Sequence, residues 1–320
     1  MTGQTERYTM ALLSCLFTLI PVIVPVSGLI LIFSIVAPAP LVVLGAKHPW
    51  RYSLAVLGGE IIALFLLQGS GVFFTVFYYG LAPLVMAQAI RLRYTIARTV
   101  MWSVLIPCGL NMLLLVSYSA VAQESPVTVI ERTIESLLQV AQERMPLPDT
   151  PQPDEPEASE DDVVAIVKSM SQIIVMILPA MMVMNFLFTN VVNYLIVRWY
   201  FGRNQPPFMI DPTDLGTWHL ADHVVWIFLL SGIMLMLPST LLKVVGWNVF
   251  ILTVALYLLH GIAITVFWMR RLPLPVSGRW LLVIAAFLFA GPLCIVMWMA
   301  AGLFDIWLDF RRQRQEPLNC

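Results

Sequence analysis

The sequence has few charged residues, few histidines and few cysteines, and these shortages exclude several classes of protein. Of the 320 residues, 12% are charged and 59% are hydrophobic, whereas globular chains are about 25% charged and about 45–50% apolar. A soluble enzyme or a nucleic-acid-binding domain of this composition could not cover its surface with polar groups. The four cysteines are not spaced like metal ligands or a disulfide framework. We therefore expect a protein whose main partner is the lipid bilayer, with no nucleic-acid partner.

The net charge of −1 is the sum of two unlike parts of the chain. Residues 124–162 contain 11 acidic and two basic residues, which gives this segment a net charge of −9. The rest of the chain carries +8. A basic membrane body with an acidic insert is therefore expected.

Long uncharged runs predict transmembrane helices, because a spanning helix needs about 20 apolar residues. The runs are residues 8–46, 52–90 (which contains one charge, Glu60, and divides at residues 68–71), 99–123, 169–197, 224–242, 244–269 and 280–304. The predicted fold class is all-α: a polytopic helical membrane protein with eight transmembrane helices, or nine if the first run crosses twice. That run contains four prolines, which kink or end helices. It is either one bent span followed by a re-entrant corner at residues 38–40, or two short spans broken near Pro25.

Four segments follow from these patterns. They are the N-terminal transmembrane helices (1–123), an acidic hydrophilic loop (124–163), the C-terminal transmembrane helices (164–310) and a basic tail (311–320). Within the loop, residues 128–144 have apolar positions at spacings of three and four, which predicts an amphipathic helix. Residues 145–162 contain five prolines and seven acids, so we expect them to be extended and solvated.

Basic residues in alternate loops predict the orientation, because cytoplasmic loops carry an excess of lysine and arginine. Ten bases fall in one set of loops: Lys47, Arg51, Arg91, Arg93, Arg98, Arg198, Arg203, Arg270, Arg271 and Arg279. The opposite set contains four. We expect a multi-pass protein of the cell (inner) membrane with the acidic loop on the outer face. The three arginines of the tail then fall on the outer side, against the rule.

Polar residues inside the predicted spans are candidates for substrate binding. Glu60 is the single acid within a span, and a carboxylate at the centre of a bilayer costs about 2.5–3.5 kcal/mol on the insertion scale. It is either a contact for a substrate or cation, or a protonated, hydrogen-bonded structural group. We hypothesise that Glu60, Asn111, Asn193 and His260 line a polar site at the midplane. Amides that only hold helices together, and a satisfied buried imidazole, are the alternatives.

Two further clusters could carry chemistry. His219, Asp222 and His223 could face one metal ion from a single helical turn, although they also fit a helix boundary at the membrane surface. Asp305 and Asp309 lie four residues apart at the end of the last span. They are either a paired acid site for a cation or part of a capped helix end.

No enzyme signature is present, which directs the prediction away from catalysis. The sequence contains no His-Glu-x-x-His motif and no P-loop, and we expect no cofactor. The first hypothesis is a transporter-like or substrate-binding membrane subunit without its own ATPase, which would need a partner ATPase or membrane protein. The alternative is a non-catalytic scaffold that organises a complex through the helix of the acidic loop. An intramembrane enzyme is a third possibility.

Several motifs together resemble a known family. They are Leu-Pro-Ala at 178–180, Val-Asn-Tyr-Leu-Ile-Val-Arg at 192–198, Trp-His-Leu-Ala-Asp at 218–222 with Val-Trp at 225–226, Tyr-Leu-Leu-His-Gly-Ile-Ala at 257–263, and Gly-Leu-Phe-Asp-Ile-Trp-Leu-Asp-Phe-Arg at 302–311. The chain resembles the YybS-like family of uncharacterised bacterial polytopic membrane proteins, a domain of unknown function. Asp305, Asp309 and Arg311 form the most specific motif. Ala221 replaces an expected proline and His260 an expected glutamine. The early half is faintly similar to substrate-capture subunits of energy-coupling-factor transporters.

Overall fold

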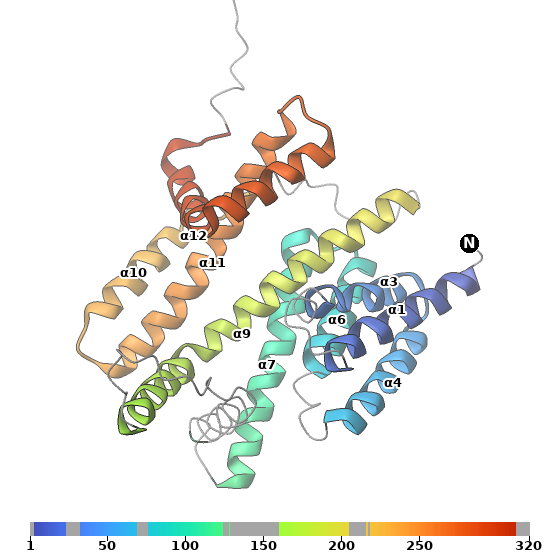
Figure 1. The fold of residues 1–320 in the computed structure, drawn as a ribbon, viewed down its shortest axis with the longest axis horizontal. Helices are drawn as coiled ribbons and strands as arrows, with labels where there is room; N and C mark the ends of the chain where they lie inside the picture. Colours follow the sequence, from blue (N-terminus) through green and yellow to red (C-terminus); the bar gives the residue numbers. More distant parts are fainter. Residues whose placement is uncertain are drawn as a thin grey trace, which may run out of the picture. The chain divides into compact units, whose positions relative to one another are not determined.

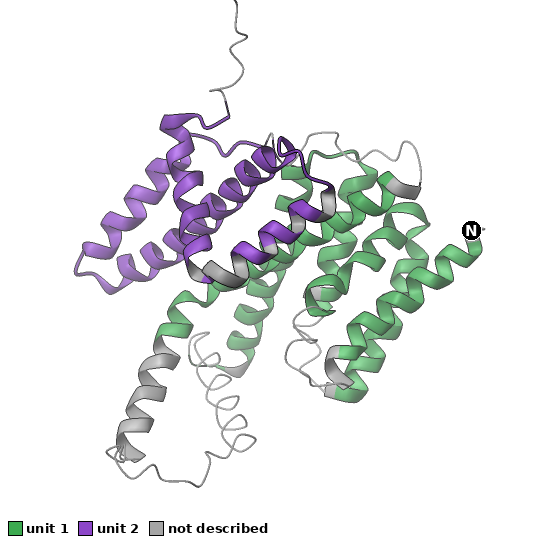
Figure 2. Cartoon of the chain, turned by 45° about the horizontal axis from the view of Figure 1, so that its top comes forward, with its two compact units in different colours: residues 1–209 green, residues 210–320 purple. Residues whose placement is uncertain are grey.

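The computed structural model describes residues 3–23, 33–68, 76–123, 128, 160–204, 216 and 218–311, and these residues form helices and turns without any strand. The chain divides into two compact units, residues 1–209 and 210–320 (Figure 2). Helix α9 (Glu160–Asn204) belongs to the first unit, because it packs against three other helices of that unit.

The first unit is built around one short, fully buried helix, α3 (Pro38–Lys47). Its residues from Pro38 to Ala46 are buried, because α3 is apolar on all sides and is surrounded by other helices. Its neighbours are α1 (Gly3–Ile23), α4 (Trp50–Gln68), the π-helix η2 (Val76–Leu81), α6 (Ala82–Arg91) and α9, and α7 (Ile96–Ala122) completes the unit by packing on η2, α6 and α9 (Figure 1).

Contacts between helix ends show the relative directions of the helices in this unit. Glu6, near the start of α1, pairs with Lys47 at the end of α3, and Arg7 donates to the Tyr52 hydroxyl near the start of α4. Arg91, at the end of α6, donates to the backbone carbonyl of His48. These ends therefore lie together. We call this region the basic end, and its bases are Arg7, Lys47, Arg51, Arg91, Arg93, Arg98 and Arg198.

The first hydrophobic run consists of two helical segments that run in opposite directions. Lys47 meets Glu6 at one end, and the ring of Phe33 lies 5.4 Å from that of Phe17 near the other end of α1. The break predicted near Pro25 lies outside the described residues. Four described helical stretches are long and apolar enough to cross a membrane by themselves: Trp50–Leu67, Ile96–Val121, Ile173–Gly202 and Thr240–Arg270.

The second unit consists of α10 (Val224–Met236), α11 (Thr240–Arg270) and α12 (Val276–Leu308). The predicted span 224–242 extends too far, because a turn that contains Pro238 ends α10 at Met236. Helix α10 is therefore about 20 Å long. The predicted span 280–304 lies within α12, which bends at Gly291, where φ is +24°.

Two glycines let α11 and α12 approach each other closely. A Cβ atom at Gly261 would overlap the backbone of Trp298, and one at Gly302 would overlap the carbonyl of Tyr257. Small residues at a crossing allow two helix backbones to pack in contact. This crossing lies beside His260 and fixes which residues of α12 can reach it.

Parts of the predicted acidic loop and tail lie outside the described residues. These include the predicted amphipathic helix at 128–144, apart from Thr128, and tail residues 312–320. At the end of the loop, α9 begins at Glu160, so the expectation of an extended chain up to residue 162 is wrong for its last three residues.

Candidate functional site

The end of α12 folds the chain back so that Arg311 points into the second unit. The helix stops at Leu308, and Asp309 adopts a left-handed conformation with φ of 41°. The amide of Asp309 donates to the backbone carbonyl of Asp305 at 2.9 Å, and the amide of Phe310 donates to Asp305 Oδ1, also at 2.9 Å. Aspartate tolerates this left-handed conformation better than most residues, so the motif itself encodes the reversal.

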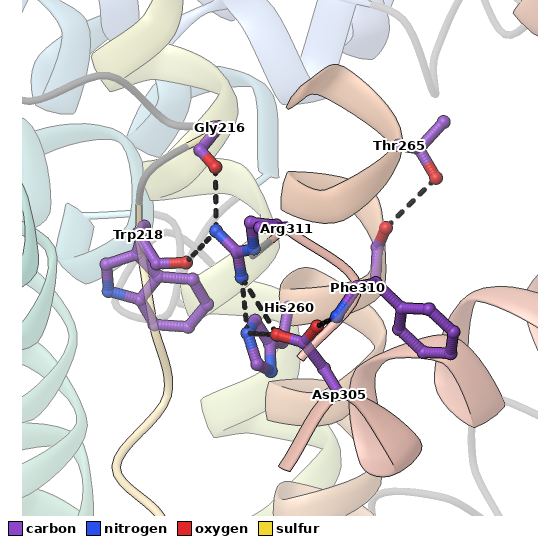
Figure 3. Close-up of polar contacts among 8 residues, drawn as sticks. Gly216, Trp218, His260, Thr265, Asp305, Phe310 and Arg311 are labelled. Atoms are coloured by element: carbon purple, nitrogen blue, oxygen red, sulfur yellow. Dashed lines mark hydrogen bonds and ion pairs between the residues drawn. The ribbon is translucent and has the colours of Figure 1, made fainter. Parts of the chain in front are cut away.

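Arg311 is the centre of a buried polar cluster (Figure 3). Its Nη1 atom donates to the carbonyl oxygens of Gly216, at 2.7 Å, and Trp218, at 2.9 Å. Its Nη2 atom lies 2.6 Å from His260 Nε2 and 3.3 Å from Asp305 Oδ2. The guanidinium therefore joins α11, the end of α12 and the segment that precedes α10.

The hydrogen bond with Arg311 determines which ring nitrogen of His260 carries the proton. An arginine can only donate hydrogen bonds, so His260 Nε2 accepts one and the ring proton of a neutral imidazole lies on Nδ1. His260 Nε2 is also 3.2 Å from Asp305 Oδ2. Both His260 Nε2 and Asp305 Oδ2 are acceptors. Because Arg311 Nη2 carries two hydrogens, it can donate one to each of them.

The cluster is almost completely removed from solvent, and its charges balance. His260, Asp305 and Arg311 are 2%, 5% and 6% exposed. The carboxylate and the guanidinium form an ion pair, and hydrogen bonds satisfy both carboxylate oxygens, which is the condition for a buried pair to be tolerated. Two buried atoms, His260 Nδ1 and Arg311 Nε, have no partner of ordinary hydrogen-bond geometry among the described residues.

The predicted metal-binding triad does not have the geometry that the hypothesis assumed. Residues 218–221 are not helical and α10 begins only at Val224, so His219, Asp222 and His223 do not share a helical turn. His219 instead lies against His260, with ring centroids 6.0 Å apart. Asp222 and His223 are exposed.

Asp305 and Asp309 have different positions at the end of α12. Asp305 pairs with Arg311 inside the second unit, whereas Asp309 forms the left-handed residue that ends the helix. Of the two expectations for these acids, this arrangement supports the capped helix end. The paired acid site for a cation has no support in it.

Glu60 lies in α4 of the first unit and has a single hydrogen-bond partner among the residues with a described position. The hydroxyl of Ser14 on α1 donates to Glu60 Oε1 at 2.7 Å. Oε2 is buried and has no partner among the described residues, and the whole side chain is 2% exposed. No basic side chain in the described part of the chain pairs with it, in contrast to Asp305.

The other residues of the predicted substrate site are distributed over the two units. Asn193 of α9 is completely buried and donates to the carbonyls of Thr189 and Ile35, while its own Oδ1 has no hydrogen-bond partner among the residues that the structure describes. Asn111 is a buried residue of α7. These residues and Glu60 belong to the first unit, whereas His260 belongs to the second.

Sequence reasoning missed the partners that complete these contacts. Ser14 gave no signal, because a serine in an apolar helix is common, and the carbonyls of Gly216 and Trp218 are backbone groups that no motif marks. A signal was available for Gly302, because it shares a motif with Asp305 and Arg311. Gly261, next to His260, is its counterpart across the crossing.

One comparison with known proteins gives a match. A family model described as "Predicted membrane protein (DUF2232)" matches residues 11–306. The matched region contains Glu60, His260 and Asp305, and it ends five residues before Arg311. No curated protein and no solved structure matches the chain. The likeness to an uncharacterised membrane protein family is therefore supported, while the YybS-like name stays a resemblance.

Proposed function

The chain belongs to the DUF2232 family of predicted membrane proteins, and from this premise we propose that it is a transporter-like subunit that binds a small substrate or a cation inside the membrane. Glu60 carries the proposal. It is an acid in the middle of an apolar helix, and one of its oxygens is buried without a hydrogen-bond partner in the described part of the chain.

Glu60 has no basic partner among the described residues. An ionisable residue within a bilayer is costly, and such residues commonly mark a pathway for a substrate, an ion or a proton. A purely structural acid would be expected to satisfy both oxygens, as Asp305 does with Arg311 and the amide of Phe310. Among the described side chains, Glu60 has only the neutral hydroxyl of Ser14 as a hydrogen-bond partner. An amine, a metal cation or a proton would supply the partner that Oε2 lacks.

The proposal assigns no catalytic role and no ATPase to this chain. Its sequence contains no P-loop, so active uptake would depend on a partner ATPase. The second candidate, a scaffold that acts through the acidic loop, depends on residues outside those described. Deleting residues 129–159 tests it directly, because a scaffold would then lose its partners while a substrate-binding body would keep its ligand.

The basic end suggests the orientation in the inner membrane. Seven described bases of the first unit lie at the basic end, and Lys168 lies near the opposite end of α9. Cytoplasmic faces are enriched in such residues. Helices α7 and α9 run between this end and the opposite one, as the hydrogen bond from Asn190 to the Ser103 carbonyl and the pairing of Tyr200 with Glu6 require. We propose that the acidic loop, which follows α7 and precedes α9, lies on the outer face.

The test is affinity purification from native membranes, with mass spectrometry of co-purifying chains, small molecules and metal ions. We compare the unaltered protein with Glu60→Gln, which keeps the shape of the side chain and removes its charge. Ser117→Ala is the matched control, because its exposed hydroxyl bonds only within its own helix. We expect the bound ligand to fall at least tenfold with Glu60→Gln and to be unchanged with Ser117→Ala.

A complementation experiment can give the result that would contradict the proposal. In a strain that lacks this protein, Glu60→Gln and Asn193→Ala should restore growth phenotypes less well than the unaltered gene. If both variants complement fully at equal membrane levels, the proposed site is wrong.

A further inference from the structure

We propose that His219, His260 and Asp305 form a site for a divalent transition-metal ion such as Zn²⁺ or Co²⁺, and that the ion takes the position held by Arg311 Nη2. The site lies entirely within the second unit and does not depend on the function proposed for Glu60.

The three side chains converge closely enough to share one ion. A ring nitrogen of each histidine and a carboxylate oxygen of Asp305 all lie within 4.8 Å of one another. His260 Nε2 and Asp305 Oδ2 are 3.2 Å apart, and two ligands of a tetrahedral zinc ion are separated by roughly 3.4 Å when each bond is about 2.1 Å. These two atoms need almost no movement, and the exposed side chain of His219 can rotate to complete the set.

The position of Arg311 shows that the site stabilises a positive charge. Its Nη2 atom lies beside both the lone pair of His260 Nε2 and the carboxylate of Asp305. In the tautomer that accepts this hydrogen bond, the ring proton is on Nδ1 and Nε2 carries a lone pair. A neutral imidazole nitrogen with a lone pair can bind a metal ion. The guanidinium is planar and rigid, so the whole group must turn about its side-chain bonds for Nη2 to leave this position.

The donor set selects the class of ion. Two imidazoles and one carboxylate favour zinc, cobalt and nickel, whereas calcium and magnesium prefer sites made of oxygen. Three protein ligands leave a fourth position for water or another small ligand. His219 is exposed while the other two ligands are buried, so the ion can enter from the His219 side.

The experiment measures Co²⁺ binding by the full-length protein, purified in detergent with a tag that contains no histidine. Visible absorption reports tetrahedral Co²⁺, and equilibrium dialysis gives the affinity. His219→Ala removes an exposed ligand and should weaken binding at least about tenfold, since loss of groups that merely support a metal ligand already costs about 10–100-fold. His223→Ala is the matched control, because it removes an exposed imidazole four residues away, and it should leave binding unchanged.

Arg311→Gln tests the competition between the guanidinium and the ion. It removes a positive charge next to the site, so it should tighten Co²⁺ binding. The proposal is overturned if neither the unaltered protein nor Arg311→Gln binds one Co²⁺, or if His223→Ala weakens binding as much as His219→Ala. The His219 and His223 variants decide the matter even if Arg311→Gln fails to fold.

Discussion

At the level of single residues, Asp309 shows how the backbone conformation of one residue can determine the position of another side chain, that of Arg311. Its positive φ reverses the chain after α12 and carries Arg311 back to Asp305 and His260. The conformation costs a β-branched residue about 1–2 kcal/mol, and glycine adopts it freely. We predict that Asp309→Val lowers the thermal stability of the purified protein, measured by fluorescence-detected unfolding, while Asp309→Gly keeps it. Equal losses would mean that contacts of the side chain, and not the backbone, matter at this position.

Glu6 makes the stability of the basic end depend on pH. Its Oε1 atom lies 2.5 Å from Lys47 Nζ and 2.6 Å from the Tyr200 hydroxyl. Burial acts to raise the pKa of Glu6, but the hydrogen bonds from Lys47 and Tyr200 and the charge of Lys47 outweigh it, so the pKa falls below its ordinary value of 4.5. A lowered pKa in the folded state stabilises the fold above the ordinary value, and this contribution is lost as the pH falls through the lowered one.

The corresponding measurement compares melting temperatures of the unaltered protein and Glu6→Gln from pH 7 to pH 3. We expect the variant to melt at a lower temperature at pH 7, and the difference to shrink once the pH drops below 4.5. Asp222→Asn, which changes an exposed acid, should show no such trend. A difference between Glu6→Gln and the unaltered protein that stays constant with pH would contradict the assignment.

At the level of helices, the crossing of α11 and α12 depends on glycine. Gly261 and Gly302 lie against the backbone of the opposite helix, whereas a Cβ at Gly232 of α10 would meet nothing within 4 Å. We predict that Gly261→Ala destabilises the protein by about 1–3 kcal/mol through overpacking. The same substitution at Gly232 should be neutral or slightly stabilising, because alanine favours helix more than glycine does.

Thermal unfolding of both variants in the same detergent is the measurement. The Gly261 variant should also lose the His260–Arg311 contact, which would alter Co²⁺ binding if the metal site exists. Equal melting temperatures for Gly261→Ala and Gly232→Ala would show that the two helices do not pack through their backbones.

At the level of the whole molecule, the helix directions in the first unit predict the side of the membrane on which each connection lies. Arg51 and Arg93 belong to the basic end, while Gln123 ends α7 at the opposite one. Single cysteines at these three positions, in a protein without its native cysteines, can be labelled in intact cells with a membrane-impermeant maleimide. We expect labelling at Gln123→Cys and none at Arg51→Cys or Arg93→Cys. The reverse pattern would invert the proposed orientation.

The bounds of the helices show which features of the fold local sequence patterns can predict. Hydropathy predicted the helical membrane class and the break after Gln68, because both depend on neighbouring residues alone. It did not predict the bend at Gly291 or the early end of α10. A proline or glycine inside a long apolar run is compatible with both a straight helix and a broken one, and the packing around it selects between them.

The sequence by itself determined that this protein is helical and lies in a membrane, since its composition and long apolar runs allow nothing else. It also marked Glu60 and His260, because polar residues are rare in such runs, and it marked Asp305 and Arg311 through the motif at 302–311. Only the tertiary structure decided which of them meet. Ser14 and Glu60 are 46 residues apart in the chain, and His260 and Arg311 are 51 apart. Such pairings depend on helix crossings and on one left-handed residue, which act over distances that no local pattern records.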